Sequence, residues 1–288
     1  MIAEEPVVFA CEGEALVGVV SHARHAAATG VAIVVGGPQY RIGSHRQFVL
    51  LARALADAGI PALRFDYRGM GDATGLQRTF EDVDSDVAAA VETLCARAGV
   101  SRVVLWGLCD GASAALFHAA RNPRVAGLVL INPWVRTEQG VARAYLGSYY
   151  RGRVTDPKLW GRVLRGEVDL RASAASLARN VRAALSRGGG DASRPPADEA
   201  SLPLPERCAR ALQRFTGRTL VILSGDDITA REFVLAAQGD ARWSDARRRA
   251  QVSWHELPGA DHTFSTRAWR DEVVAATVAF VRDLDAAA

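Results

Sequence analysis

The sequence predicts an α/β fold in which a mostly parallel, twisted sheet of eight strands carries helices on both faces. Short apolar segments such as residues 31–35 are typical of strands that are covered on both sides. These segments alternate with segments of helical periodicity, and such alternation is typical of parallel sheets. The 288 residues, 49% of them hydrophobic, suffice for one large core with an insertion.

The elements follow one another along the chain in a regular order. We predict strands at residues 6–10, 15–21, 31–35, 61–65, 103–106, 125–132, 219–223 and 252–257. The first two flank Glu12-Gly13-Glu14 and indicate an antiparallel hairpin. We predict helices after Ser44, which could cap the first of them, and at residues 80–96, 112–120 and 269–284. Parallel sheets bind ligands beyond the carboxyl ends of their strands, so residues 36–40, 109 and 132–134 lie where a site is expected.

The regular alternation stops between residues 134 and 206, where no strand is evident. We predict that residues 1–133 and 207–288 form the core and that 134–206 form a helical cap, or lid, over the site. Glycine and proline clusters in 186–205 indicate a flexible segment. The cap holds 12 basic and 8 acidic residues, a net charge of +4 that would suit an anionic ligand or simply a solvated helical surface.

Composition and termini narrow the class of protein. No apolar run is long enough for a membrane-spanning helix, and the acidic start of the chain does not resemble a signal peptide. The four cysteines are scattered without metal-ligand spacing, so we expect reduced thiols in the cytoplasm, with no metal and no cofactor. The net charge of +3 is too small for a dedicated nucleic-acid binder.

Cys109 stands in the sequence Gly107-Leu108-Cys109-Asp110-Gly111, between a predicted strand and a predicted helix. This context predicts a nucleophile elbow, with cysteine where serine is usual. The small residues on either side let the strand and helix approach, and the helix N-terminus favours a thiolate. Taken alone, the motif favours Cys109 as a small buried apolar residue, and only a downstream acid and histidine in the right order reverse that preference.

A cysteine nucleophile needs a base, and the base needs a group that orients it. His262 follows the last predicted strand, and Asp226 and Asp227 follow the strand before it. The order nucleophile, acid, histidine is that of α/β-hydrolases. We predict the triad Cys109, Asp227 and His262, with Asp226 as the alternative acid, because spacing hardly separates the two. Asp261 is poorly placed to reach the ring of its neighbour.

An oxyanion hole would combine the N–H of Asp110 with one from the loop after Val35. Pro38 has no N–H, so the second donor is Gly37 or Gln39. A carboxylate at Asp110, if it points inward, opposes the formation of a thiolate next to it. We expect substrate contacts at three residues near the mouth, His45, Arg46 and Trp134.

Several strings of residues resemble one family in particular. They are Gly-Gly-Pro-Gln-Tyr-Arg (36–41), Gly-Ser-His-Arg-Gln-Phe (43–48), Arg-Phe-Asp-Tyr-Arg-Gly-Met-Gly-Asp (64–72), Trp-Gly-Leu-Cys-Asp (106–110), Asn-Pro-Trp-Val-Arg-Thr-Glu (132–138) and Ala-Asp-His-Thr-Phe-Ser (260–265). Together they resemble the exosortase A system-associated hydrolase 1 family, and more broadly the lid-bearing α/β-hydrolases related to serine aminopeptidases and lipases. The resemblance implies an α/β-hydrolase fold. It favours Asp227 as the acid, and it implies a bacterium that makes exopolysaccharide and sorts proteins with a PEP-CTERM tail.

We therefore expect an acyl hydrolase or acyl transferase that forms an acyl-enzyme at Cys109. Its substrate would be a small-molecule ester or thioester, the latter linked to coenzyme A or to a carrier protein, because thiols exchange readily with thioesters. A peptidase is disfavoured, since expelling an amine is harder. The alternative is a non-catalytic protein of the same fold that binds an acyl ligand or a protein partner in the same pocket.

Overall fold

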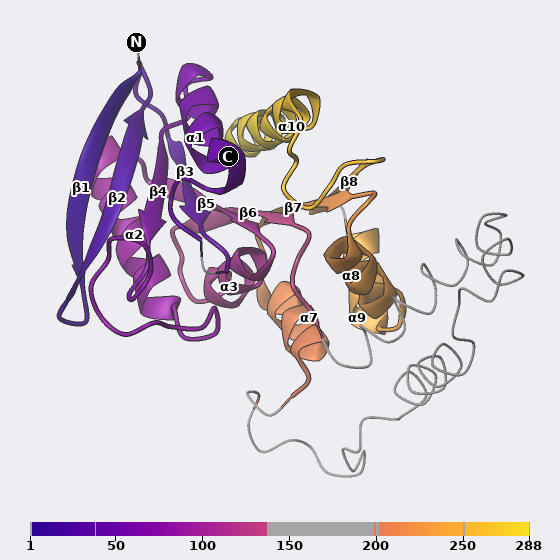
Figure 1. Ribbon diagram of the computed structural model, residues 1–288. Coiled ribbons are helices and arrows are strands. Elements are labelled where there is room, and N and C mark those ends of the chain that lie inside the picture. Colours follow the sequence, from indigo (N-terminus) through magenta and orange to yellow (C-terminus); the bar gives the residue numbers. More distant parts are fainter. Residues whose placement is uncertain (1, 38, 137–198, 200–201, 250, 288) are drawn as a thin grey trace, which may run out of the picture.

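The computed structural model describes residues 2–37, 39–136, 199, 202–249 and 251–287 (Figure 1). Pro38 and residues 137–198 of the predicted cap lie outside the described residues. The strands of the described chain are β1 Ala3–Cys11, β2 Glu14–His22, β3 Thr29–Val34, β4 Ala62–Asp66, β5 Arg102–Leu108, β6 Val125–Ile131, β7 Arg218–Ser224 and β8 Val252–Leu257.

These eight strands form one sheet in the order β1-β2-β4-β3-β5-β6-β7-β8. Strand β2 pairs antiparallel with both β1 and β4, and every other pair is parallel. The register places Val31 beside Ala62 on one side and beside Val104 on the other, so β3 lies inside the sheet. The prediction of an eight-stranded, mostly parallel sheet is confirmed.

Helices cover both faces of this sheet (Figure 1). They are α1 Gln47–Asp57, α2 Asp84–Ala98, α3 Asp110–Ala119, α7 Leu204–Arg214, α8 Ile228–Gln238, α9 Ala241–Arg248 and α10 Arg267–Ala286. Helices α1 and α10 pack on one face, and the others on the opposite face. Strand β3 shows why both faces need cover: Val31 and Ile33 join one core cluster, whereas Ala32 and Val34 join the other.

Three features differ from the sequence-based expectations or add to them. Helix α7 before β7, and helices α8 and α9 between β7 and β8, were not predicted. Ser44 does not cap α1, because the chain first makes a short 3-10 turn, Ser44–Arg46, and the N-cap residue of α1 is Arg46. Helix α7 begins at Leu204, so it spans the predicted end of the cap at residue 206. Within the described ranges no helix has the length and apolar character needed to cross a bilayer.

Candidate active site

Cys109 stands at the turn that joins β5 to α3. Its backbone has φ 63° and ψ −125°, a strained conformation for a residue with a side chain. A Cβ atom on Gly107 would lie 2.4 Å from the carbonyl oxygen of Gly111, and one on Gly111 would lie 2.5 Å from that of Val34. Only glycine therefore fits on either side of the turn. The geometry is that of a nucleophile elbow, and the Cys109 side chain remains partly accessible.

Neighbouring backbone groups fix this elbow in place. The Cys109 N–H donates to the carbonyl of Ile131 at 2.9 Å, at the end of the adjacent strand β6. The Cys109 carbonyl accepts the N–H groups of Ala112 and Trp134, each at 3.1 Å. Cys109 is thus held at the carboxyl end of the sheet and at the N-terminus of α3, where the helix dipole favours negative charge.

His262 and Asp227 come to the same edge from two further loops. The Nδ1 atom of His262 lies 2.9 Å from Oδ2 of Asp227, and the imidazole also forms a hydrogen bond with Cys109. Since Nδ1 faces the carboxylate, Nε2 is the nitrogen left for the sulfur. Asp227 is the N-cap residue of α8, and its carboxylate also accepts the N–H groups of Thr229 and Ala230. The helix start therefore holds the acid in the orientation that meets the ring.

These contacts shift the two titrating groups in opposite directions. The hydrogen bond to Asp227, followed by that to Cys109, raises the pKa of His262 to about 10 and outweighs its burial. Burial alone would raise the pKa of Asp227, but its bonds with His262 and the α8 backbone lower it overall. The pair is thus an imidazolium beside a carboxylate at neutral pH.

The other two aspartates near this histidine have different partners. Asp226 is exposed over 77% of its side chain and pairs with Arg231. Asp261 accepts the backbone N–H groups of Thr263 and Ser265, so it shapes the loop that carries His262. Of the two candidates that the sequence left open, Asp227 is the carboxylate in contact with the ring.

Two of the N–H groups predicted to form the oxyanion hole, those of Asp110 and Gly37, are already hydrogen-bonded to the Asp110 carboxylate. The Asp110 side chain points inward, where Oδ1 accepts the Gly111 N–H at 3.0 Å and the carboxylate also accepts the N–H groups of Gly37 and of Asp110 itself. The Gln39 N–H donates to the Gly37 carbonyl at 2.7 Å. Of the two proposed second donors, Gly37 is therefore the one whose N–H faces the elbow, and Asp110 already engages it.

Asp110 is a half-buried charge in an unusual position. Burial raises the pKa of its carboxyl, although three backbone N–H groups and His262 act against that shift. A substrate carbonyl oxygen would need the same N–H groups. The carboxylate must therefore move aside or become neutral before an oxyanion can bind there.

A buried network that the sequence did not reveal joins the loops of the acid and the histidine. Asn132, at the end of β6, donates from Nδ2 to Ser224 Oγ at 2.8 Å and accepts the Ser224 N–H at 2.9 Å. Ser224 Oγ donates to the Asp261 carbonyl at 3.0 Å. In the sequence, the only sign of this network is that Asn132 and Ser224 both stand at the ends of predicted strands. The network ties the residue before His262 to the strand that leads to Asp227.

The expected substrate contacts fall in two groups. Trp134 lies beside the elbow through its N–H bond to Cys109, and Arg136 stacks over its ring at 4.3 Å. His45 and Arg46 are exposed in left-handed conformations, with φ 52° and 61°. In the part of the chain that the structure describes, neither side chain forms a hydrogen bond with Cys109, Asp227 or His262. Among the described residues, no group of three or more histidine, cysteine or acidic side chains is placed to hold a metal ion.

Comparison with known proteins gives matches across most of the chain. A family model described as the alpha/beta hydrolase family matches residues 32–276. Human protein ABHD12B is 40% identical over 72 residues, a stretch that covers 25% of this chain and only 19% of that protein.

Solved structures of this fold are similar at low sequence identity. The esterase Pf2001 of Pyrococcus furiosus has a TM-score of 0.65 at 15% identity, covering 98% of this chain and 93% of its own. The proline iminopeptidase of Mycobacterium smegmatis has a TM-score of 0.60 at 18% identity, covering 98% of this chain and 99% of its own. Est1E of Butyrivibrio proteoclasticus, solved with ferulic acid, has a TM-score of 0.61 at 14% identity, covering 97% and 99%.

Proposed function

The chain belongs to the alpha/beta hydrolase family, and from that premise we propose that it is an acyl hydrolase or acyl transferase working through a covalent acyl-enzyme at Cys109. The observation that carries the proposal is the contact chain from Asp227 through His262 to Cys109 at the carboxyl edge of the sheet. A strained elbow, a base and an orienting carboxylate are the parts that nucleophilic acyl transfer requires.

In the first half of the proposed reaction, Cys109 Sγ attacks the carbonyl carbon of the substrate. The C–S bond forms while the carbonyl electron pair moves onto oxygen, next to the N–H groups of Asp110 and Gly37. When the intermediate collapses, the bond to the leaving group breaks, and the leaving group takes the Nε2 proton of His262. In the second half, His262 takes a proton from water or another acceptor, whose oxygen attacks the thioester and releases Cys109.

The substrate class we propose is a small-molecule ester or thioester. The similarity to the esterase Pf2001 supports an ester in this type of fold, and a thiol nucleophile exchanges readily with thioesters. The resemblance of the motifs extends the proposal to a cytoplasmic role in exosortase and exopolysaccharide systems. On this proposal the acyl group arrives on coenzyme A or on a carrier protein.

A second candidate function is a non-catalytic protein that binds an acyl ligand or a protein partner in the same pocket. The observation that favours it is the Asp110 carboxylate, which occupies the N–H groups that an oxyanion needs. If that carboxylate stays in place and charged, the N–H groups cannot stabilise the oxyanion that an attack by Cys109 would form.

Steady-state hydrolysis separates the two functions. The substrates are p-nitrophenyl acetate, butyrate, octanoate and laurate and the matching acyl-coenzyme A thioesters. We expect turnover by the native chain and a loss of roughly 10³-fold in kcat/KM in both Cys109→Ala and His262→Ala. Cys95→Ala is the matched control, since Cys95 is a buried thiol on α2, and it should keep full activity. No turnover of any of these substrates by the native chain would favour the binding protein.

A further inference from the structure

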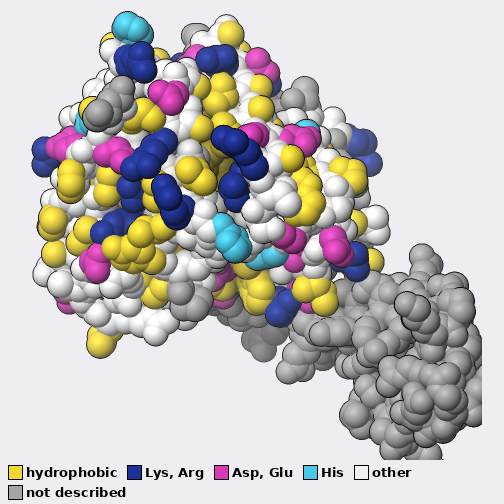
Figure 2. Space-filling model, turned by 45° about the horizontal axis from the view of Figure 1, so that its top comes forward, with side chains coloured by type: hydrophobic (Ala, Val, Ile, Leu, Met, Phe, Trp, Pro, Cys, Tyr) yellow, Lys and Arg dark blue, Asp and Glu magenta, His cyan; other side chains and the backbone are white. Residues whose placement is uncertain are grey.

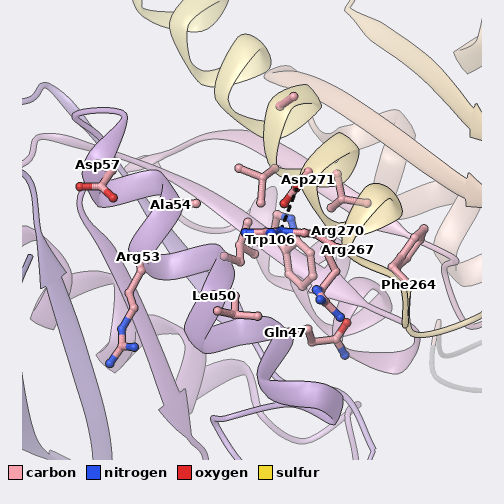
Figure 3. Close-up of a pocket in the computed structure, with 14 residues that line it drawn as sticks. Gln47, Leu50, Arg53, Ala54, Asp57, Trp106, Phe264, Arg267, Arg270 and Asp271 are labelled. Atoms are coloured by element: carbon pink, nitrogen blue, oxygen red, sulfur yellow. Dashed lines mark ion pairs between the residues drawn. The ribbon is translucent and has the colours of Figure 1, made fainter.

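A hollow lies between α1 and α10, the two helices that cover the same face of the sheet (Figure 3). Its volume is about 760 Å³, which is in the range of sites for small-molecule ligands. Cys109, Asp227 and His262 do not line it. We call it the α1/α10 groove.

The floor of the α1/α10 groove is apolar. Trp106 from β5, Phe264 from the loop after His262 and Val273 from α10 line it, and each is at most 5% exposed. Leu50 stands at its edge and is one of the few large hydrophobic side chains exposed among the described residues. A hydrophobic chain laid in the groove would therefore be removed from water along most of its length.

Two buried N–H donors belong to residues that line the groove. Gln47 is 7% exposed and Trp106 is 3% exposed, yet Gln47 Nε2 and Trp106 Nε1 have no hydrogen-bond partner within the described residues. A buried donor without a partner costs free energy unless something supplies an acceptor. Because neither N–H is exposed to solvent, a ligand oxygen reaches it only when the side chain turns towards the groove.

The rim of the groove is basic. Three arginines, Arg53, Arg267 and Arg270, line it together with Asp57 and Asp271, and the ion pair drawn in Figure 3 joins Arg267 to Asp271. On the face shown in Figure 2, basic side chains flank a strip of hydrophobic ones. Arg53 is already paired with Glu4 on β1. Arg267, by contrast, is 90% exposed, and its Nε lies 3.9 Å from the carboxylate of Asp271. Arg267 is thus the rim guanidinium with the loosest partner.

We propose that the α1/α10 groove binds a small amphipathic carboxylate, that is, a hydrophobic tail with one singly charged head group. The tail would cover Trp106 and Phe264, and the carboxylate oxygens would accept hydrogen bonds from the unpartnered donors and from the rim arginines. One carboxylate matches the one loosely paired guanidinium, Arg267, whereas a doubly charged head group would also face Asp57 and Asp271. This inference does not depend on the proposed acyl chemistry.

Laurate, kept below its micelle concentration, is the probe, and the indole N–H resonances of the native chain are the readout. Trp106→Phe assigns the Trp106 resonance, and Trp134 reports separately on the candidate active site. We expect laurate to shift the Trp106 resonance in a saturable way. Dodecanol, which lacks the charge, should bind about tenfold more weakly, and so should laurate to the Gln47→Leu variant.

A matched pair of variants locates the binding site. Ala54→Trp fills the groove from α1 and should abolish the shift, whereas Ala96→Trp, at an exposed position on α2, should leave it unchanged. The proposal fails if laurate moves only the Trp134 resonance, or if Ala54→Trp binds laurate as well as the native chain does. Tighter binding of dodecanol or of dodecyl phosphate would overturn the choice of head group. A Trp106 shift that depends on protein concentration without laurate would instead identify an interface between copies.

Discussion

At the scale of single residues, the site depends on how Asp110 shares space with the nucleophile. Its carboxylate accepts the N–H groups of Gly111 and Gly37, so it occupies positions where a substrate oxygen would bind. The negative charge also lies where the reaction would build up more negative charge. We infer that Asp110 restrains the reaction rather than promoting it.

Neutralising this side chain tests that inference. In Asp110→Asn we expect kcat on p-nitrophenyl acetate to rise by about tenfold at mildly alkaline pH, because the amide has a similar shape but carries no charge. Asp226→Asn is the matched control, since Asp226 is exposed and pairs with Arg231 outside the elbow. A tenfold loss of activity in Asp110→Asn would mean that the carboxyl group takes part in the chemistry.

At the scale of elements, three strand ends must stay in register for the side chains to meet. Strands β6 and β7 are joined beyond their last ladder bonds by Asn132 and Ser224, and Ser224 also holds the Asp261 carbonyl. This network is buried, so water cannot replace the hydrogen bonds that a substitution removes. It positions the loop of His262 without touching a substrate.

Removing the Ser224 hydroxyl should release that loop. We expect Ser224→Ala to lower kcat about tenfold with little change in KM, since a small displacement of a catalytic group is costly. The free energy of unfolding should fall by about 1–3 kcal/mol, because Asn132 Nδ2 loses a buried partner. Ser253→Ala on β8 is the control, as its hydroxyl makes only a 3.4 Å contact with a backbone carbonyl at an exposed position. Unchanged kcat in Ser224→Ala would show that the network is not needed for catalysis.

The sequence predicted all eight strands and four of the described helices, and it missed α7, α8 and α9. The buried parallel strands were expected because they are almost wholly apolar, and β1 and β2 because they flank a glycine turn typical of a hairpin. Helix α9 was not expected, since it is mostly polar and buries mainly Trp243 and Ala246. Helix α8 was hidden for another reason: Asp227 reads as part of a turn, whereas it caps the helix and also meets His262.

The candidate site shows the same division. Chain order and the glycine spacing were enough to select Cys109, His262 and two candidate acids. The choice of Asp227, the inward carboxylate of Asp110 and the Asn132–Ser224 network depend on side-chain directions in three dimensions. A linear pattern does not contain those directions.

At the scale of the whole molecule, the stability of the fold should depend on the ionisation of His262. Its pKa is about 10 in the folded chain and about 6.5 in an unfolded one. Because the folded value is raised, the folded state binds the proton more tightly. The stabilisation is then fully present below about pH 6.5 and is lost as the pH rises through about 10.

Urea unfolding of the native chain and of His262→Gln checks this dependence. We expect the native chain to have the higher free energy of unfolding. The difference from the variant should be largest at mildly acidic pH and should shrink as the pH rises towards 10. Asp227→Asn removes the charged hydrogen-bond partner that contributes most to the raised pKa of His262. In that background, the stability lost on replacing His262 with Gln should depend less on pH. A difference that grows with rising pH would contradict the assignment.

The most direct test of the account is the mass of the intact protein after brief exposure to an activated ester such as p-nitrophenyl butyrate. We predict that the native chain gains the mass of one butyryl group, that peptide mapping places it on Cys109, and that hydroxylamine removes it as it removes thioesters. His262→Ala should acylate more slowly, and Cys109→Ala should gain nothing. An acyl group found equally on Cys109→Ala, or none on the native chain while the ester is being turned over, would contradict the account.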